Sequence, residues 1–391
     1  MNEKILHPEV QQFISEHINA DISKLIFKGS PFKGITIQEL AAQIVSKKKS
    51  EQKLPSWFNS ENIYYPNKIN IEQTSSEITA KYKSDLVSGA SFIDITGGLG
   101  VDDYYIAKKF SSGVHCELNT ELSEITQHNF TQLGITNMTF IQGDGIDYIL
   151  KNETHYDWIY SDPSRRNETK GKVFLLADCL PDIPSHLDSL FEKTEHILLK
   201  LSPVLDITSA LNELKFTKEI HVVGVNNEVK ELLFILQKGY AENPKIKTLN
   251  ISKKETEYFE FNFKEESIPT YSEPRSYLYE PNTSILKSGG FSKVSEKLGI
   301  DKLHQHSHLY TSKKIVKFPG RSFKIESVVT YDKKKLKKLI PSKKANITIR
   351  NFPETVQQIR KKTGLKDGGD LYLFFTTSES DKKIVVVCKK L

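Results

Sequence analysis

The sequence of 391 residues is poor in cysteine and has no long apolar run. Its three cysteines are Cys116, Cys179 and Cys388, and no two of them form a C-x-x-C pair. This spacing excludes a disulfide framework and a zinc ribbon. No apolar stretch reaches about 18 residues, so we expect no transmembrane helix and no membrane partner. The N-terminal residues lack the basic and then apolar pattern of a signal peptide, and these absences together predict a cytoplasmic protein.

Charge is abundant but unevenly placed. The chain has 55 Lys and Arg against 49 Asp and Glu, a net charge of +6. Residues 331–391 alone hold 16 basic and 6 acidic residues, a net charge of +10, which leaves the preceding residues at −4. The length favours two or three domains. A basic module attached to a mildly acidic body indicates a polyanionic partner.

Apolar spacing divides the chain into four segments. Residues 1–72 have the i, i+3, i+4 spacing of helices. Residues 73–265 alternate short apolar runs with helical stretches, which predicts an α/β domain with a parallel sheet. Residues 266–320 are rich in Pro and Tyr at their start and predict a linker with a small helical subdomain. Residues 321–391 have a β-α-β-α-β-β pattern, which predicts a compact α+β module.

Seven strands are expected in the α/β domain. Their ranges are 91–96, 113–118, 138–142, 156–161, 196–201, 219–223 and 230–236. The last two are joined by residues 224–229, which are too few for a parallel crossover, so these two strands are expected to form an antiparallel hairpin.

A glycine-rich turn follows the first of these strands. The run from Asp94 to Asp102 reads Asp-Ile-Thr-Gly-Gly-Leu-Gly-Val-Asp, which does not match the G-x-G-x-x-G pattern of NAD-binding proteins. A strand, a glycine turn and a helix start bring backbone N–H groups close to a ligand. The acid ahead of the glycines fits an adenosyl cofactor with a cationic centre, because a carboxylate can meet its amino or sulfonium end. The candidate binding residues of this turn are Asp94, Thr96, Gly97, Gly98 and Gly100.

Two further acids end the next two strands. Glu117 follows Asp94 by 23 residues, close to the offset of a ribose-binding carboxylate, and Asp144 can accept a hydrogen bond from an adenine amino group. The carboxyl ends of parallel strands share one edge of a sheet, where open α/β sheets bind ligands. We therefore expect Asp94, Glu117 and Asp144 to form one cofactor site.

The fourth strand ends in a candidate catalytic motif, Asp162-Pro163-Ser164-Arg165-Arg166. A carboxylate held by proline can accept a hydrogen bond from a nucleophile and orient its lone pair towards an activated methyl group, so that catalysis works mainly by proximity. Arg165 and Arg166 can hold a phosphate or stack on a base. Asp162, Pro163 and Arg165 are the candidate catalytic residues.

These motifs resemble the class I S-adenosylmethionine-dependent methyltransferases over residues 73–240. The resemblance implies a Rossmann-like sheet of seven strands with an antiparallel last strand, and S-adenosyl-L-methionine as the cofactor. The run from Glu72 to Lys83, the Asp162 motif and the basic tail look like a bacterial group with a C-terminal THUMP-like domain. THUMP domains are associated with RNA, chiefly tRNA. No metal is expected, because the sulfonium already provides a good leaving group.

One departure concerns the methylated atom. Relatives that methylate amines usually have two prolines and an aromatic residue after the acid, whereas this chain has Ser164 and Arg165 there. Carbon-5 methylation of uracil needs a cysteine nucleophile. Cys179 is the only cysteine nearby in sequence and its flanks do not resemble known nucleophile motifs, which argues against that reaction.

The resulting hypothesis is a methyltransferase that modifies a nucleotide of structured RNA, either tRNA or rRNA, with the basic tail holding the phosphate backbone. Two alternatives stay open: an RNA-binding protein with a non-catalytic methyltransferase fold, and a small-molecule methyltransferase. Gln73, Ser75 and Lys83 precede the first strand and either close over the cofactor or serve as helix-cap and surface residues. His304, His306 and His308 alternate along the chain and are expected to be exposed polar residues rather than metal ligands.

Overall fold

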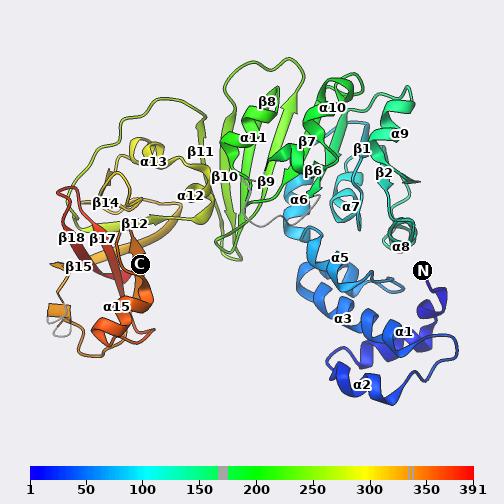
Figure 1. Cartoon of the computed structure of the whole chain (residues 1–391), viewed down its shortest axis with the longest axis horizontal. Coiled ribbons are helices and arrows are strands. Elements are labelled where there is room, and N and C mark those ends of the chain that lie inside the picture. Colours follow the sequence, from blue (N-terminus) through cyan, green and yellow to red (C-terminus); the bar gives the residue numbers. More distant parts are fainter. Residues whose placement is uncertain (166–174, 333–334, 337–338) are drawn as a thin grey trace. The chain divides into compact units, whose positions relative to one another are not determined.

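The computed structural model describes residues 1–165, 175–332, 335–336 and 339–391 (Figure 1). Residues 166–174 and the side chain of Arg165 are outside this description. Contacts divide the chain into two units. The first unit contains residues 1–218 and 233–241, and the second contains residues 219–232 and 242–391. None of the described helices is long and apolar enough to cross a membrane.

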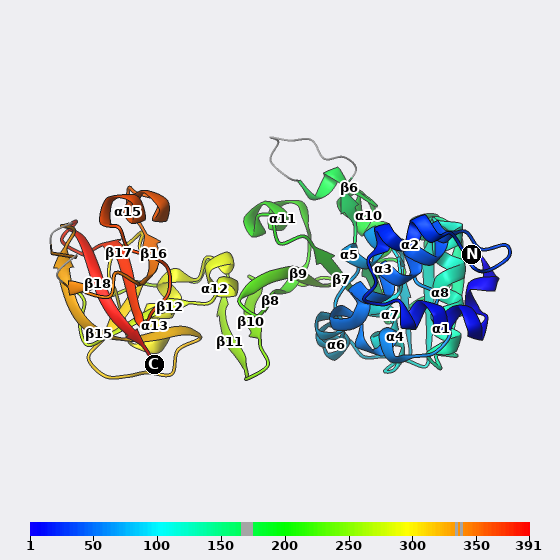
Figure 2. The same cartoon turned by 90° about the horizontal axis from the view of Figure 1, so that it is seen from below.

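The N-terminal helices pack against the α/β part of the first unit. They are a short 3-10 turn η1 (Glu3–Leu6) and the helices α1 (Pro8–Glu16), α2 (Ile22–Lys28), α3 (Ile37–Lys53), α4 (Pro55–Asn59), α5 (Lys68–Gln73) and α6 (Glu77–Leu86). Thr36 and Glu39 form a capping box that starts α3. Figure 2 shows these helices in blue beside α7 (Val101–Ala107) and α8 (Thr120–Gln132). One hydrophobic cluster joins Trp57 of α4 to Tyr104 of α7 and Phe130 of α8.

The first unit contains a parallel sheet with the strand order β7-β4-β1-β2-β3. The strands are β1 (Ser91–Asp94), β2 (Ser112–Glu117), β3 (Met138–Gln142), β4 (Trp158–Ser161) and β7 (His196–Leu201). Chain order runs outward from β1 in both directions, so the topological switch point lies between β1 and β4. Ligands bind at such a point in open α/β sheets.

The remaining elements of the first unit are short. They are the helices α9 (Gly145–Lys151), α10 (Ile183–Leu190) and α11 (Ile207–Glu213), the turn η2 (Leu176–Asp178), and a two-stranded ladder of β5 (Ser164–Arg165) and β6 (Cys179–Leu180). The end of β9, from Leu233 onward, also belongs to this unit.

The expected hairpin is formed by β8 (Thr217–Val225) and β9 (Glu228–Gln237), which are neighbours in the sheet. Asn226 and Asn227 both have positive φ, 51° and 63°, as a two-residue type I′ turn requires. Two strands that the sequence did not predict follow: β10 (Lys245–Ile251) is parallel to β8, and β11 (Thr256–Asn262) is antiparallel to β10. All seven expected strands are therefore present, and the α/β fold class is confirmed with two strands added.

A second sheet contains seven strands in the order β13-β14-β12-β15-β18-β17-β16. The expectation of a linker and helical subdomain over residues 266–320 was incomplete. This segment contains the helices α12 (Thr283–Ser288) and α13 (Phe291–Leu298), but also the strands β12 (Tyr277–Pro281), β13 (Asp301–Lys302) and β14 (Tyr310–Ser312). The C-terminal part adds β15 (Gly320–Thr330), β16 (Asn346–Arg350), α15 (Val356–Thr363), β17 (Leu371–Thr377) and β18 (Lys383–Lys390).

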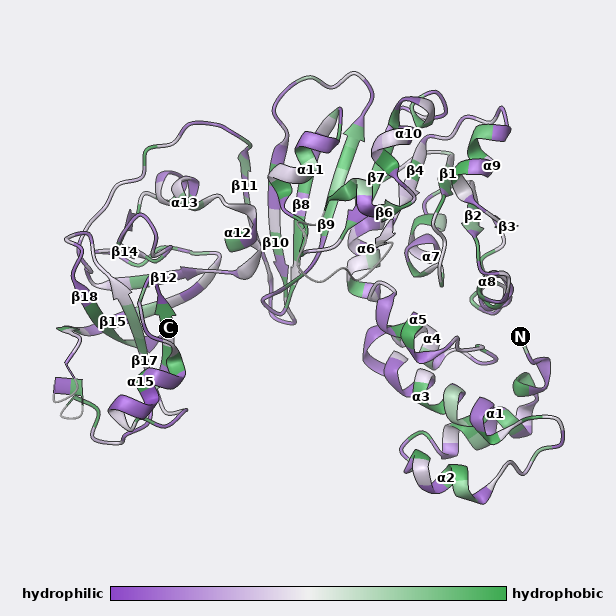
Figure 3. Ribbon diagram, viewed as in Figure 1, coloured by the Kyte–Doolittle hydropathy of each residue, from purple (hydrophilic) through white to green (hydrophobic). Residues whose placement is uncertain are grey.

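The strand β12 pairs with β15, so residues 266–320 and the C-terminal part contribute strands to one hydrogen-bonded sheet. Phe374, Phe323 and Leu278 are fully buried together in the core of this sheet. Hydrophobic residues also follow the strands β8 and β9, which Figure 3 shows in green. Burial on strands and polarity in the loops explain why the strand pattern could be recognised from the sequence.

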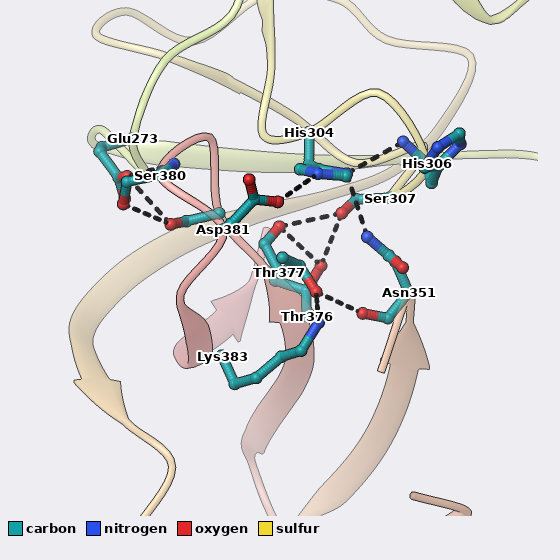
Figure 4. A network of polar contacts seen from close by, with 11 residues as sticks. Glu273, His304, His306, Ser307, Asn351, Thr376, Thr377, Ser380, Asp381 and Lys383 are labelled. Carbon is teal, nitrogen blue, oxygen red and sulfur yellow. Dashed lines mark hydrogen bonds and ion pairs between the residues drawn. The ribbon is translucent and has the colours of Figure 1, made fainter. Parts of the chain in front are cut away.

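Polar contacts around His304 join the β13–β14 loop to the C-terminal strands (Figure 4). His304 Nε2 lies 3.0 Å from Asp381 Oδ1, and its Nδ1 lies 3.0 Å from Asn351 Nδ2. The side chain of His304 is 11% exposed, and the ring of His308 stacks on Phe291 with centroids 3.5 Å apart. The expectation that these histidines are simply exposed is therefore wrong for His304, because loop packing brings it against residues distant in sequence.

Candidate active site

Four acidic residues end four adjacent strands of the parallel sheet. Asp94 ends β1, Glu117 ends β2, Asp144 follows β3 and Asp162 follows β4. Because β4, β1, β2 and β3 are consecutive in the sheet, these residues lie along one edge. The structure thus brings together the strand ends that the sequence selected.

Thr96 links the ends of β1 and β4. Asp94 Oδ1 accepts hydrogen bonds from the Thr96 backbone N at 2.7 Å and from the Thr96 hydroxyl at 2.9 Å. The backbone N of Asp162 in turn donates to Thr96 Oγ1 at 2.7 Å. The start of the glycine turn and the candidate catalytic residue are therefore held in a fixed relation across the switch point.

Glu117 holds the glycine turn from the neighbouring strand. Its Oε2 accepts from the backbone N of Gly98 at 2.8 Å, and its Oε1 accepts from the backbone N of Asn119 at 2.7 Å. Gly98 has φ +62°, a left-handed conformation that favours glycine. The next residue, Leu118, is 72% exposed, so an apolar side chain borders this edge of the sheet.

Gly97 and Gly100 are required for close packing. A Cβ on Gly97 would lie 2.5 Å from His115 Nε2 and 2.6 Å from the carbonyl oxygen of Cys116. Gly100 has φ +67°, and a Cβ there would lie 2.8 Å from the ring of Phe130. These two glycines therefore bring the turn onto β2 and α8.

Asp144 is exposed and caps α9, because its Oδ1 accepts from the backbone N of Asp147 at 3.0 Å. It is placed beside the other strand ends by two contacts. The backbone N of Gly143 donates to the Glu117 carbonyl at 3.0 Å, and Gly145 packs against the backbone of Ile95 so closely that a Cβ would collide.

Beneath the turn lies a buried cluster that the sequence did not reveal. The carboxylates of Asp94 and Asp103 lie close together, and Asp103 Oδ2 lies 2.7 Å from His115 Nδ1. Burial, together with the charge of Asp103, raises the pKa of Asp94 well above its usual value, and burial also raises that of Asp103. Burial lowers the pKa of His115.

The ligand atoms of Asp94, Asp103 and His115 lie within 4.8 Å of one another, a spacing that a metal ion could use. Hydrogen bonds within the cluster and to Thr96 already occupy several of these atoms, and Asp94 is only 2% exposed. Among the described residues, Asp103 Oδ1 and His115 Nε2 have no hydrogen-bond partner, and the His115 ring supports the glycine turn at Gly97.

Asp162 is paired with a lysine from the neighbouring strand. Lys200 of β7 donates from its Nζ to Asp162 Oδ2, and the two side chains are 12% and 41% exposed, respectively. Pro163 is buried. The side chain of Arg165 and all of Arg166 lie outside the described residues, so the structure gives no contacts for their predicted roles.

A second buried network surrounds Asp102, the last residue of the glycine motif. Its Oδ2 accepts from the hydroxyls of Ser75 and Tyr160, both at 2.7 Å, and its Oδ1 lies 3.1 Å from Lys83 Nζ. Burial opposes ionisation of Asp102, but the charges of Lys83 and Lys200 and the two hydrogen bonds outweigh it, so its pKa is lowered. Lys83 is 0% exposed, which rules out the surface interpretation for this residue.

Comparison with known proteins agrees with this fold. Residues 320–390 match a family described as THUMP domain-like, and residues 277–319 match a family described as a ferredoxin-like domain. The crystal structure of a proposed methyltransferase from Porphyromonas gingivalis W83 is 32% identical, covers 100% of this chain and 98% of its own, and superimposes with a TM-score of 0.89. Comparison with curated proteins gives no significant match.

More distant structures match only part of the chain. An rRNA methylase from Streptococcus thermophilus is 13% identical, with a TM-score of 0.31 over 41% of this chain and 94% of its own. A proposed methyltransferase from Streptococcus mutans in complex with SAH is 12% identical, with a TM-score of 0.31 over 41% of this chain and 96% of its own.

The full-length match, the parallel sheet and its strand-end acids define a methyltransferase fold. The chain belongs to the class I S-adenosylmethionine-dependent methyltransferases, in the group that carries a C-terminal THUMP-like domain. The predicted family is thereby confirmed.

Proposed function

We propose that this protein transfers a methyl group from S-adenosyl-L-methionine to RNA. The observation that carries the proposal is the connected edge of β4, β1 and β2, where Thr96 ties Asp94 to Asp162 and Glu117 holds Gly98. Glu117 and Asp144, at the ends of β2 and β3, would hold the adenosyl part of the cofactor, and Asp162, at the end of β4, would receive the methyl acceptor.

The expected cofactor contacts follow from the hydrogen-bond acceptors at the strand ends. Each Glu117 oxygen accepts one backbone N–H and retains lone-pair capacity for the ribose hydroxyls. The exposed side chain of Leu118 offers an apolar surface for adenine, and Asp144 can accept from its amino group. Asp94 is buried and acts by shaping the turn, so the Gly97–Gly100 backbone itself faces the methionine part.

Methyl transfer is assigned to the end of β4. The 41% exposure of the Asp162 side chain makes its carboxylate accessible to a nucleophile, and Pro163 and Thr96 fix its backbone. Holding the nucleophile in line with the methyl group supplies most of the rate enhancement. Arg165 retains its proposed role as a contact to a phosphate or a base.

RNA is the proposed partner because of the C-terminal charge. Residues 331–391 carry a net charge of +10, and most of this segment falls within the THUMP domain-like match. Lysines and arginines that neutralise phosphates supply most of the salt-dependent affinity for nucleic acid. We assign residues 73–265 to catalysis and 321–391 to RNA binding, in a cytoplasmic protein.

Calorimetry with S-adenosyl-L-methionine tests the cofactor site. We expect binding by the wild-type chain and a loss of about tenfold or more in affinity for Glu117→Ala, since a buried ribose hydroxyl loses its partner. Glu195→Ala is a matched control, because Glu195 is a 66% exposed acid on the same unit. Absence of binding by the wild-type chain at millimolar cofactor would contradict the proposal.

Transfer of tritiated methyl groups to RNA from a strain that lacks this protein tests the activity. We expect label in RNA with the wild-type chain and little with Asp162→Ala. Deleting residues 331–391 is expected to weaken RNA binding and to reduce its salt dependence. Equal labelling by Asp162→Ala would show that the catalytic assignment is wrong.

A further inference from the structure

Two lysines approach the strand ends at which methyl transfer is proposed. Lys200, near the end of β7, donates to Asp162 Oδ2 and is 12% exposed. Lys83 of α6 is fully buried, with its Nζ 3.1 Å from Asp102 Oδ1 and 3.2 Å from Ser75 Oγ. Asp162 itself is 41% exposed, so the Lys200 ion pair lies at the border between the interior and the accessible edge.

The two ion pairs belong to one electrostatic group. Tyr160 of β4 lies two residues before Asp162 and donates to Asp102 Oδ2 at 2.7 Å. The charges of both Lys83 and Lys200 act on Asp102 and help to lower its pKa. Lys200 therefore pairs with Asp162 at the carboxyl end of β4, while Lys83 pairs with Asp102 at the start of α7.

This charge pattern distinguishes between acceptor atoms. An amine nitrogen gains positive charge as it attacks a sulfonium methyl group, and a neighbouring ammonium opposes that change. A hydroxyl oxygen loses its proton during attack and gains negative character, which a neighbouring ammonium stabilises. Groups that stabilise charge as it develops in the transition state contribute most to catalysis. The Lys200–Asp162 pair suits a hydroxyl acceptor.

The segment after Asp162 supports the same choice. Ser164 is exposed and its backbone pairs with Leu180 in the β5–β6 ladder, so the chain places no aromatic ring directly after Pro163 for a base to stack on. Chemistry on a base requires that the base leave the stack, whereas a sugar hydroxyl is accessible from the backbone side.

We infer that the methyl acceptor is a ribose hydroxyl of RNA, with Asp162 taking the proton and Lys200 positioning Asp162 and stabilising the oxygen. The inference rests on the proposed function and specifies its substrate atom. The hydroxyl oxygen forms a bond to the methyl carbon, the carbon–sulfur bond breaks, and its electron pair stays on sulfur as a neutral thioether. The hydroxyl proton passes to Asp162 Oδ1 and from there to solvent.

The position of the label in RNA decides the question. RNA from a strain that lacks the protein is labelled by the wild-type chain and digested to nucleosides, and mass spectrometry then separates sugar from base. We expect the label on the sugar, together with resistance to alkaline cleavage after the labelled nucleotide. Label on a base overturns the inference and leaves the proposed methyltransferase function intact. No label in RNA overturns both.

Variants of Lys200 test its role in the same assay. Lys200→Met is expected to lower kcat about tenfold or more, with the KM for RNA and the cofactor affinity changed less than about twofold. Lys200→Arg keeps the charge and is expected to recover part of the rate. Lys215→Met is the control, because Lys215 pairs with Asp188 at 3.1 Å on the exposed surface of the same unit.

A double variant shows whether Lys200 acts through Asp162. Lys200→Met combined with Asp162→Asn is expected to be no slower than the slower single variant, since both changes disable one unit. Fully additive losses, or an unchanged kcat in folded Lys200→Met, overturn the assigned role. If Lys200→Met does not fold, the rate of Lys200→Arg still tests the role of Lys200, and the position of the label still tests the ribose acceptor.

Discussion

Removal of the buried ammonium of Lys83 should destabilise the first unit strongly. In Lys83→Met a side chain of similar length replaces the lysine, but the Asp102 carboxylate, 8% exposed, loses its partner at 3.1 Å. The hydroxyls of Ser75 and Tyr160 remain as donors. Breaking a buried ion pair in this way costs about 3–5 kcal/mol, mostly because one charge is left buried and unpaired.

Urea denaturation followed by tryptophan fluorescence measures this loss. Both tryptophans of the chain, Trp57 and Trp158, are in the first unit, so the signal reports its unfolding. Lys48→Met serves as the control, because Lys48 pairs with Glu51 at 2.7 Å with both side chains more than 40% exposed. Such exposed pairs contribute at most about 1 kcal/mol.

A second substitution separates charge from packing. In Lys83→Met with Asp102→Asn, the amide keeps an acceptor oxygen for Tyr160 but carries no charge, so the double variant should recover at least about 1 kcal/mol relative to Lys83→Met. The reasoning is refuted if Lys83→Met costs no more than Lys48→Met, or if the double variant is less stable than the single one.

Three further predictions concern the glycine turn and its support. Gly97→Ala should cost about 1–3 kcal/mol and weaken cofactor binding in calorimetry, because its Cβ would lie 2.6 Å from the Cys116 carbonyl oxygen; unchanged affinity would contradict the contact. Thr96→Val removes the hydroxyl that joins Asp94 to Asp162 and should lower kcat more than cofactor affinity in the methyl-transfer assay. His115 has a lowered pKa in the folded chain, so its contribution to stability is present above pH about 6.5 and is lost as pH falls below it. His115→Gln should therefore reduce the acid-side slope of the unfolding free energy by up to about 1.4 kcal/mol per pH unit, and an unchanged slope would show that His115 does not titrate on unfolding.

Much of the α/β fold could be predicted because its signals are local. Buried strands such as β1 and β7 are short apolar runs, and the Asn226-Asn227 turn lies between two such runs. The strands β10 and β11 were not predicted, because charged and polar residues interrupt the apolar ones in both and neither contains a continuous apolar run. The strand β12 was missed because it lies in a Pro- and Tyr-rich segment whose partner, β15, is distant in sequence.

The sequence by itself determined the parallel sheet, the four acids at its strand ends and the basic C-terminal module. Periodicity and net charge are local properties, and parallel strands necessarily place their carboxyl ends at one edge. Only the tertiary structure decided which cations meet these acids. Lys83 pairs with Asp102 and Lys200 with Asp162 across neighbouring elements, and His115 lies under Gly97. Such partners depend on side-chain direction and on strand neighbours far apart in sequence, and no periodic pattern in the chain encodes them.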